Sequence, residues 1–338
     1  MRTRRAGVAM TVLLGAALCL LGVLAGCGGK IDKPSEIDKT IRMGEYSYMP
    51  AFRGFDNSVA LSIAEGTLYV AYFDSLATPP TAAVRAYFSN GTQVPANLVG
   101  DFTGLARPTA IGAGKREIAV ADRADEITVR IYGTTGGAPT LSFTDPEWKS
   151  ISGLAVDDTG NIYVCDAERN FVRSYKPSGR RRFEVDLADS GFGIGHVLGP
   201  TGLALDGETL LISEGHAEKA QVQRIRIDQP QTGIPFSTEN PYISVFTDTD
   251  GNEMPLARPV GVGVGKEGSI FVLDQGLGKV FRFNADGTSV TVVNTAESDG
   301  PTDLTSAVSI DTYNLGASAS IYVLEATKGV IHRWDPKQ

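Results

Sequence analysis

The chain has 338 residues, of which 42% are hydrophobic, and its 39 acidic side chains outnumber 31 basic ones to give a formal net charge of −8 at neutral pH. Nucleic acids and anionic lipid headgroups would repel such a chain, so the charge argues against both as partners.

The first residues of the chain predict export. Arginines at positions 2, 4 and 5 give a positive start, and an uncharged apolar run extends from Val8 to Leu24. A positive start, a short apolar core and small residues after it are typical of a secretory signal. The tetrapeptide Leu24-Ala25-Gly26-Cys27 then resembles the lipobox of bacterial lipoproteins. The resemblance implies cleavage before Cys27 and acylation, for example with palmitate, of its thiol and of the new N-terminus.

The alternative for this segment is an uncleaved signal anchor with a chance cysteine. The small residues Ala25 and Gly26 and the polar chain after Cys27 favour lipidation. Two or three acyl chains hold a protein stably on a bilayer, so we expect attachment through lipid. Gly28 stands where an aspartate would imply retention in the inner membrane. We therefore expect a cell-envelope protein, at the outer membrane if the host has one and otherwise on the outer face of the cell membrane.

We expect three parts: a signal peptide at 1–26, a lipidated flexible tether at 27–39 and one folded domain at 40–338. The tether is polar and lacks periodicity. Loss of residues 1–26 removes three arginines and no acid, so the mature net charge becomes −11. Cys165 is then the cysteine left without lipid, so no disulfide forms within one chain. It ends an apolar run, which predicts a small buried residue rather than a nucleophile.

The rest of the chain repeats one unit six times. Each unit begins with a small residue followed by large, small and large residues, and Ala113 alone breaks the large positions. The six starts are Ala60-Leu61-Ser62-Ile63, Ala110-Ile111-Gly112-Ala113, Gly153-Leu154-Ala155-Val156, Gly202-Leu203-Ala204-Leu205, Gly261-Val262-Gly263-Val264 and Ala307-Val308-Ser309-Ile310. A second apolar run follows in every unit, and a third runs from a β-branched residue to an aromatic residue or isoleucine. The third runs are Val84–Tyr87, Val129–Tyr132, Val172–Tyr175, Val222–Ile225, Val280–Phe283 and Ile331–Trp334.

These units predict an all-β fold. Short runs rich in Val, Ile and aromatic residues, separated by Gly, Asn, Asp and Pro, are strand and turn signals. A repeat of roughly 40 to 60 residues with three or four strands is typical of a β-propeller blade. The small residues fit the innermost strands, which converge on the axis where space is least. A β-solenoid is the alternative, but its rungs are shorter and more regular.

A six-bladed propeller needs a closing strand. The last unit stops at Asp335-Pro336-Lys337-Gln338, just after its third run, whereas Thr40–Met49 precedes the first unit without belonging to it. We expect this N-terminal segment to supply the outer strand of the last blade, because pairing there leaves no open sheet edge.

The units resemble NHL repeats. The best match is Gly153-Leu-Ala-Val-Asp-Asp-Thr-Gly-Asn-Ile-Tyr-Val-Cys-Asp-Ala-Glu-Arg-Asn-Phe-Val-Arg-Ser-Tyr175, the units from Pro200 and Pro259 are similar, and the others are degenerate. The resemblance extends over nearly everything from Ser58 to Asp335. It implies a TolB-like six-bladed propeller but no single activity, because the family includes scaffolds, binding modules and enzymes.

An acid recurs just past the second run of five units. The candidate rim consists of Asp122, Asp166, Glu214, Asp274 and Glu325, with His216 beside Glu214. One interpretation is a ring around the channel mouth that binds a cation or polar ligand, with Ca²⁺ or Zn²⁺ as the ions to consider. The other is that each carboxylate caps backbone N–H groups of its own turn, which repetition in every blade favours.

No cofactor is predicted, and the three histidines do not match the clustered zinc-binding histidines of the lyases that the repeat resembles. This favours a binding or scaffold module that recognises an envelope protein, a peptide or a glycan. A metal-dependent hydrolase or lyase with its site at the channel mouth is the alternative, and a structural assembly part is a third hypothesis.

Overall fold

The computed structural model describes residues 45–228, 242–247, 252–287, 290–315 and 318–337. The predicted signal, Cys27 and the predicted tether lie outside these residues. The described chain is all-β, with three 3-10 turns at Lys266–Gly268, Ala296–Ser298 and Ala326–Lys328 as its helical elements. No helix within these ranges is long and apolar enough to span a membrane.

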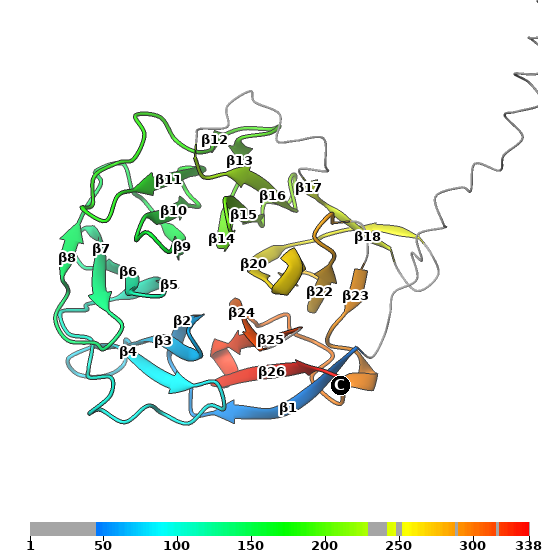
Figure 1. Ribbon diagram of the computed structural model, residues 1–338, viewed down its shortest axis with the longest axis horizontal. Helices are drawn as coiled ribbons and strands as arrows, with labels where there is room; N and C mark the ends of the chain where they lie inside the picture. Colours follow the sequence, from blue (N-terminus) through cyan, green and yellow to red (C-terminus); the bar gives the residue numbers. More distant parts are fainter. Residues whose placement is uncertain (1–44, 229–241, 248–251, 288–289, 316–317, 338) are drawn as a thin grey trace, which may run out of the picture. The chain divides into compact units, whose positions relative to one another are not determined.

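Six antiparallel sheets are arranged around a common axis as blades (Figure 1). Their strands, in order from the axis outward, are as follows. Blade 1 has β2 (Ser58–Ala64), β3 (Thr67–Asp74) and β4 (Thr81–Phe88); blade 2 has β5 (Pro108–Ala113), β6 (Glu117–Arg123), β7 (Ile127–Gly133) and β8 (Leu141–Phe143). Blade 3 has β9 (Ile151–Val156), β10 (Ile162–Asp166) and β11 (Phe171–Tyr175); blade 4 has β14 (Pro200–Asp206), β15 (Thr209–Glu214), β16 (Gln221–Arg226) and β17 (Tyr242–Ile243). Blade 5 has β20 (Pro259–Val264), β21 (Ile270–Asp274), β22 (Lys279–Phe283) and β23 (Val290–Val292); blade 6 has β24 (Ser309–Leu315), β25 (Ser318–Glu325), β26 (Val330–Pro336) and β1 (Tyr46–Arg53).

Two short ribbons lie outside the blades. They are β12 (Asp189–Ser190) with β13 (His196–Val197), and β18 (Val245–Thr247) with β19 (Glu253–Pro255). Within the described residues, blades 1 and 3 have three strands instead of four, and isolated bridges such as Tyr87–Gln93 stand where the fourth would be. Pro95 follows that bridge closely, and proline has no N–H with which to extend a ladder.

The predicted closure by the N-terminal segment is confirmed. Strand β1 pairs antiparallel with β26, with Tyr46 opposite Pro336 and Tyr48 opposite Trp334. The strand ends at Arg53, later than the predicted Met49, after a register shift between Met49 and Phe52. The two ends of the folded chain therefore lie in one sheet, and the last blade has no unpaired edge at β26.

The hydrophobic core is distributed among the blades. Six clusters of buried side chains are present, and each joins residues of two adjacent sheets. One of them closes the ring, because Leu61 and Val70 of blade 1 pack with Tyr322 and Ile331 of blade 6. Each sheet is thus buried on both faces, which is why the strands are almost continuously apolar.

Small residues are required where inner strands meet. A Cβ atom on Gly112 would lie 2.7 Å from the backbone oxygen of Leu154 in the next blade, and one on Gly153 would lie 3.0 Å from Cα of Gly202. The predicted packing at the axis is therefore confirmed at these positions.

The sixth unit needs a correction. In blade 3, Gly153 pairs with Cys165, the residue before the recurrent acid. The residue before Glu325 is Leu324, and its partner is Ser309 rather than Ala307. The sixth unit is therefore Ser309-Ile310-Asp311-Thr312, two residues later than predicted. This shift places Asp311 where Ser62, Gly112, Ala155, Ala204 and Gly263 stand in the other blades.

Candidate functional site

The five predicted acids all lie at or next to the end of a second strand, and all five are fully buried. Four of them accept hydrogen bonds from backbone N–H groups just before the inner strand of their own blade. The bonds run from Ala106 and Arg107 to Asp122, from Lys149 and Ser150 to Asp166, from Leu198 to Glu214, and from Ala257 and Arg258 to Asp274. Each of these carboxylates fixes the loop that leads into the blade, as the capping interpretation expects.

Asp166 shows the arrangement most fully. Its Oδ2 atom accepts N–H groups of Lys149 and Ser150 at 2.6 and 3.0 Å, and its Oδ1 atom accepts those of Glu168 and Arg169 at 3.0 and 2.9 Å. Four backbone donors to one carboxylate leave little capacity for a further ligand. The binding of a cation or polar ligand by this rim stays a prediction.

Glu325 differs from these four acids because its partners are side chains rather than backbone N–H groups. Its carboxylate accepts hydrogen bonds from Ser306 and from Nε2 of His332, and it pairs with Lys328 at 2.8 Å. Burial acts to raise the pKa of Glu325, but hydrogen bonds from Lys328, Ser306 and His332 outweigh it and hold that pKa below its usual range. Glu325 is therefore ionised at neutral pH.

The three histidines have separate environments. His216 is exposed, and its Nδ1 atom accepts the Glu218 N–H. His196 pairs with Asp189 in the ribbon of β12 and β13, and His332 lies buried between Glu325 and the hydroxyl of Tyr48. Among the described residues, no group of three or more His, Cys, Asp or Glu side chains is placed to hold a metal ion.

Cys165 is fully buried, as predicted, and burial raises the pKa of its thiol to about 12. In blade 1, Tyr72 takes the place of the acid, and its hydroxyl lies 2.8 Å from that of Tyr87.

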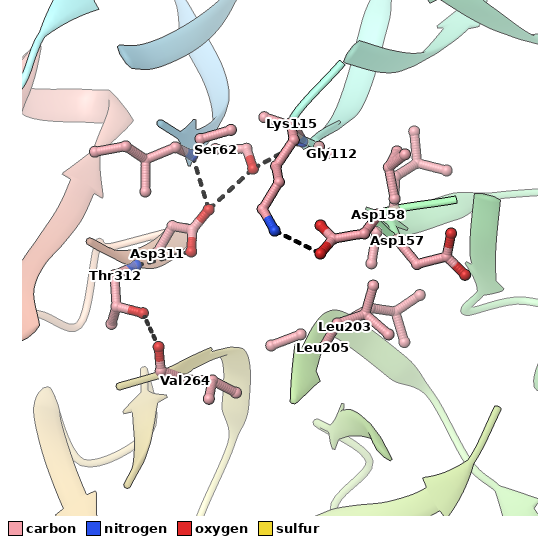
Figure 2. A pocket seen from close by; sticks show the side chains of 18 of the residues that line it. Ser62, Gly112, Lys115, Asp157, Asp158, Leu203, Leu205, Val264, Asp311 and Thr312 are labelled. Atoms are coloured by element: carbon pink, nitrogen blue, oxygen red, sulfur yellow. Dashed lines mark hydrogen bonds and ion pairs between the residues drawn. The ribbon is translucent and has the colours of Figure 1, made fainter. Parts of the chain in front are cut away.

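A pocket of about 760 Å³ opens at the other end of the channel (Figure 2). We call it the channel pocket. Its wall is formed by the last residues of the inner strands and the turns after them, and all six blades contribute, from Ser62 in blade 1 to Thr312 in blade 6. The loops bound by the rim acids precede the same inner strands, so the rim and the channel pocket lie at opposite ends of the channel. A cavity of about 130 Å³ lies along the middle of these strands, and Ser62 and Asp311 line both spaces.

Asp311 is the polar centre of this site. Its Oδ2 atom accepts the Ser62 hydroxyl and the Ile63 N–H, each at 2.9 Å, and its Oδ1 atom accepts the Thr312 N–H at 2.7 Å. The Ser62 oxygen in turn accepts the Ala113 N–H at 3.0 Å. The network joins blades 1, 2 and 6 at the floor of the pocket. Sequence reasoning missed Asp311 because the sixth unit was placed two residues too early.

The surroundings of Asp311 change its acidity. Burial raises the pKa of Asp311 to about 6, although the N–H groups of Ile63 and Thr312 and the Ser62 hydroxyl act to lower it. The carboxylate is therefore mainly ionised at pH 7 but within reach of protonation just below it. Asp311 is half-buried, and a partly desolvated carboxyl with a perturbed pKa inside a concave pocket is typical of a functional site.

One basic side chain of the described residues lines the channel pocket. Lys115, from the turn between β5 and β6, pairs at 2.5 Å with Asp158 from the turn between β9 and β10. Figure 2 shows the Lys115 ammonium and the Asp311 carboxylate both directed into the pocket, from different blades. Asp157, the residue before Asp158, accepts hydrogen bonds from the side chains of Thr159, Asn161 and Tyr163.

Comparisons with known proteins agree with the fold. Residues 150–175 match the family model of the NHL repeat. No curated protein sequence matches the chain. Among solved structures, a streptogramin B lyase is similar at 15% identity and a TM-score of 0.55, with 86% of this chain and 98% of that one covered. A catalytically inactive variant of virginiamycin B lyase from Staphylococcus aureus, with quinupristin, is similar at 12% identity and a TM-score of 0.52, with 87% and 100% covered.

A protein of unknown function from Bacteroides thetaiotaomicron is similar at 15% identity and a TM-score of 0.55, with 88% of this chain and 75% of that one covered. Identities this low support the shared architecture and no activity. The chain is thus a six-bladed β-propeller that contains an NHL repeat.

Proposed function

We propose that this chain is an envelope-anchored lipoprotein whose propeller binds a protein, peptide or glycan partner at the channel pocket. The observation that carries the proposal is the convergence of all six blades on one pocket of about 760 Å³ with Asp311 at its floor. Concave sites of this size with a few convergent polar groups are the usual form of a ligand site. The rigid, mutually packed blades would hold such a site ready for a partner.

The test compares two tryptophan substitutions at opposite ends of the channel. Lys115→Trp places a bulky ring at the channel pocket, whereas Lys149→Trp places the same ring on the loop before β9, at the rim end. Both lysines are exposed, so both variants should fold. We expect peptides or glycans selected on arrays with the purified mature chain to lose binding to Lys115→Trp and to keep binding to Lys149→Trp. Equal binding by both variants would contradict the channel pocket as the site.

The alternative, a metal-dependent hydrolase or lyase, has a separate readout. Metal analysis of the purified protein would support it if a stoichiometric ion were found and were lost in folded Asp166→Asn or Glu214→Gln variants. Circular dichroism spectra of these variants are required, because both carboxylates also hold backbone loops. That outcome would replace the binding module by an enzyme with its site at the rim.

The anchor is supported by the sequence at Leu24-Ala25-Gly26-Cys27. We expect the chain to incorporate labelled palmitate and to sediment with membranes. A Cys27→Ala variant should incorporate none and appear in the soluble fraction or as an unprocessed precursor. Membrane attachment of the mature Cys27→Ala chain would contradict lipid anchoring.

A further inference from the structure

Among the described residues, Asp311 is a carboxylate with no counter-ion. Its hydrogen-bond partners are the Ser62 hydroxyl and the N–H groups of Ile63 and Thr312, all of them neutral. Among the interactions between described residues, none joins Asp311 to a lysine or an arginine. Oδ1 has one of these donors and Oδ2 has two, and a carboxylate oxygen accepts about two hydrogen bonds. Oδ1 therefore keeps acceptor capacity, and Figure 2 shows the Asp311 carboxylate directed into the channel pocket.

The charge around the pocket has one prevailing sign. The charged residues in its wall are Glu65, Asp157, Asp158 and Asp311 against Lys115. Burial acts to raise the pKa of Asp157, but hydrogen bonds from Asn161, Thr159 and Tyr163 hold it below its usual range. The pairing of Lys115 with Asp158 cancels one negative charge and leaves the others. A cleft of one sign between walls of low dielectric constant concentrates ions of the opposite sign.

The packing around Asp311 favours a ligand, rather than the protein, as the source of a positive charge. The equivalent positions in the other five blades hold serine, glycine or alanine, so the side chain at this level that reaches the carboxylate is the neutral Ser62 hydroxyl, and none of the five is basic. The space stays open to the pocket instead. A long, narrow side chain with a cationic end would fit between these small residues.

We propose that the channel pocket takes the ammonium or guanidinium group of a lysine or arginine side chain from a partner polypeptide, with Asp311 as its counter-ion. This inference rests on the proposed binding function and narrows its ligand from a protein, peptide or glycan to a basic polypeptide segment. A charge-assisted hydrogen bond to Asp311 Oδ1 would hold the cation. Calcium is the competing cation, but it takes six to eight oxygen ligands, and the oxygens of Asp311 and Ser62 are already partly committed.

The experiment uses the mature chain and two short glycine-rich peptides. One has a central lysine and the other has Nε-acetyl-lysine at the same place. Binding is followed by calorimetry and by the amide resonances of Ile63 and Thr312, whose N–H groups contact Asp311. We expect the lysine peptide to shift both resonances and to bind about tenfold or more tightly than the acetylated one. Asp311→Asn should abolish the difference.

The control is Asp125→Asn, which removes the same charge from an exposed turn between β6 and β7 and should leave the difference intact. Equal binding of both peptides with shifts at Ile63 and Thr312 would overturn the cation inference and leave the binding function standing. No shift with either peptide at millimolar concentration would overturn the cation inference, and the comparison of Lys115→Trp with Lys149→Trp would then decide the binding function on its own. If calcium chloride alone gave the same shifts with saturation dependent on Asp311, the site would be a metal site and the inference would be wrong.

Discussion

Asp311 departs from a rule that the other five blades follow. Its position holds Ser62, Gly112, Ala155, Ala204 and Gly263 elsewhere, because the inner strands approach one another closely there. A carboxylate at this place loses part of its hydration and has no cation beside it within the described protein. The loss of hydration raises the pKa of Asp311, so the ionised side chain destabilises the folded protein.

We therefore expect Asp311→Asn to stabilise the protein at pH 7. The pKa of Asp311 is about 6 in the fold against an ordinary value of 3.8. The folded protein thus binds more protons than the unfolded chain between these values, so the penalty is fully present above pH 6 and disappears as the pH falls below about 4. The free energy of unfolding, measured with urea, should rise by about 1–3 kcal/mol at pH 7. The lower end of this range allows for the hydrogen bond that the Thr312 N–H loses when the Asp311 carboxylate is replaced by an amide.

The same measurement at pH 4 should show no such gain. Asp125→Asn, at an exposed turn, should change neither value. If Asp311→Asn instead lost more stability at pH 7 than at pH 4, the ionised carboxylate would be a stabilising group, and the charge penalty inferred for it would be wrong.

The sequence predicted the small residues of the inner strands but not Asp311, and strand geometry explains the difference. Side chains in a strand alternate with a period of two, so a two-residue slip preserves the pattern of small and large positions. The start at Ala307 matched the pattern better than the true start at Ser309, because Asp311 and Thr312 stand at a small and a large position of the true unit. The spacing to the acid does not identify the true start either, since Ser309 lies 16 residues before Glu325, against 12 or 13 in the other units.

At the scale of the strand, the tight contacts between blades are the feature to test. Gly112 in β5 approaches the backbone of Leu154, whereas a Cβ atom on Gly133 in β7 of the same blade would have its nearest neighbour, Thr135 Oγ1, at 4.0 Å. We expect Gly112→Ala to lower the free energy of unfolding by about 1–3 kcal/mol, because backbone atoms must move apart.

Gly133→Ala is the matched control and should be neutral or stabilise by about 0.5 kcal/mol, through a smaller loss of chain entropy on folding. Urea unfolding measures both variants. Equal effects of the two substitutions would mean that the inner strands separate without cost and that the small residues are not required by packing.

Strand β1 closes the ring, and one of its side chains contacts β26, a strand far away in the sequence. The Tyr48 hydroxyl lies 2.8 Å from Nδ1 of the buried His332, whose Nε2 lies 2.7 Å from Glu325. Tyr48→Phe should cost about 1–2 kcal/mol of stability, because a buried ring nitrogen loses its partner. Hydrogen exchange should quicken in β1 and β26 before other strands.

A double-mutant cycle with His332→Phe measures the contact itself. The cost of Tyr48→Phe should largely vanish when His332 is already replaced. Additive losses would show that the hydroxyl contributes elsewhere. The sequence predicted that the N-terminal segment pairs with the last blade, but this contact could not be predicted, because it depends on a register that a bulge after Met49 shifts.

At the scale of the molecule, local pattern predicted the architecture and could not locate the site. Six similar units in one chain indicate one ring, and each unit carries its own strands and its own acid or, in blade 1, a tyrosine in its place. The residues of the channel pocket instead differ from blade to blade, and its charged side chains come from blades 1, 2, 3 and 6 without recurring in every unit. Residues that do not recur in every unit form a site only when the ring brings them together. The repeat pattern therefore indicated the recurrent acids, at the opposite end of the channel, as the candidate site.

The Lys115 ammonium would compete with an incoming cation for the acidic side chains of the channel pocket. Its ammonium lies inside the pocket and pairs with Asp158, and both side chains are more than half exposed. Lys115→Ala removes a like charge from the path to Asp311 and frees Asp158. Affinity for the lysine peptide should therefore rise about two- to fivefold at low ionic strength, as calorimetry can measure. The gain should shrink at 0.5 M salt, where the Debye length is about 4 Å and exposed charges are screened. Lys149→Ala removes an exposed lysine at the rim end and should have no such effect, and a lower affinity for Lys115→Ala would mean that the lysine itself contacts the ligand.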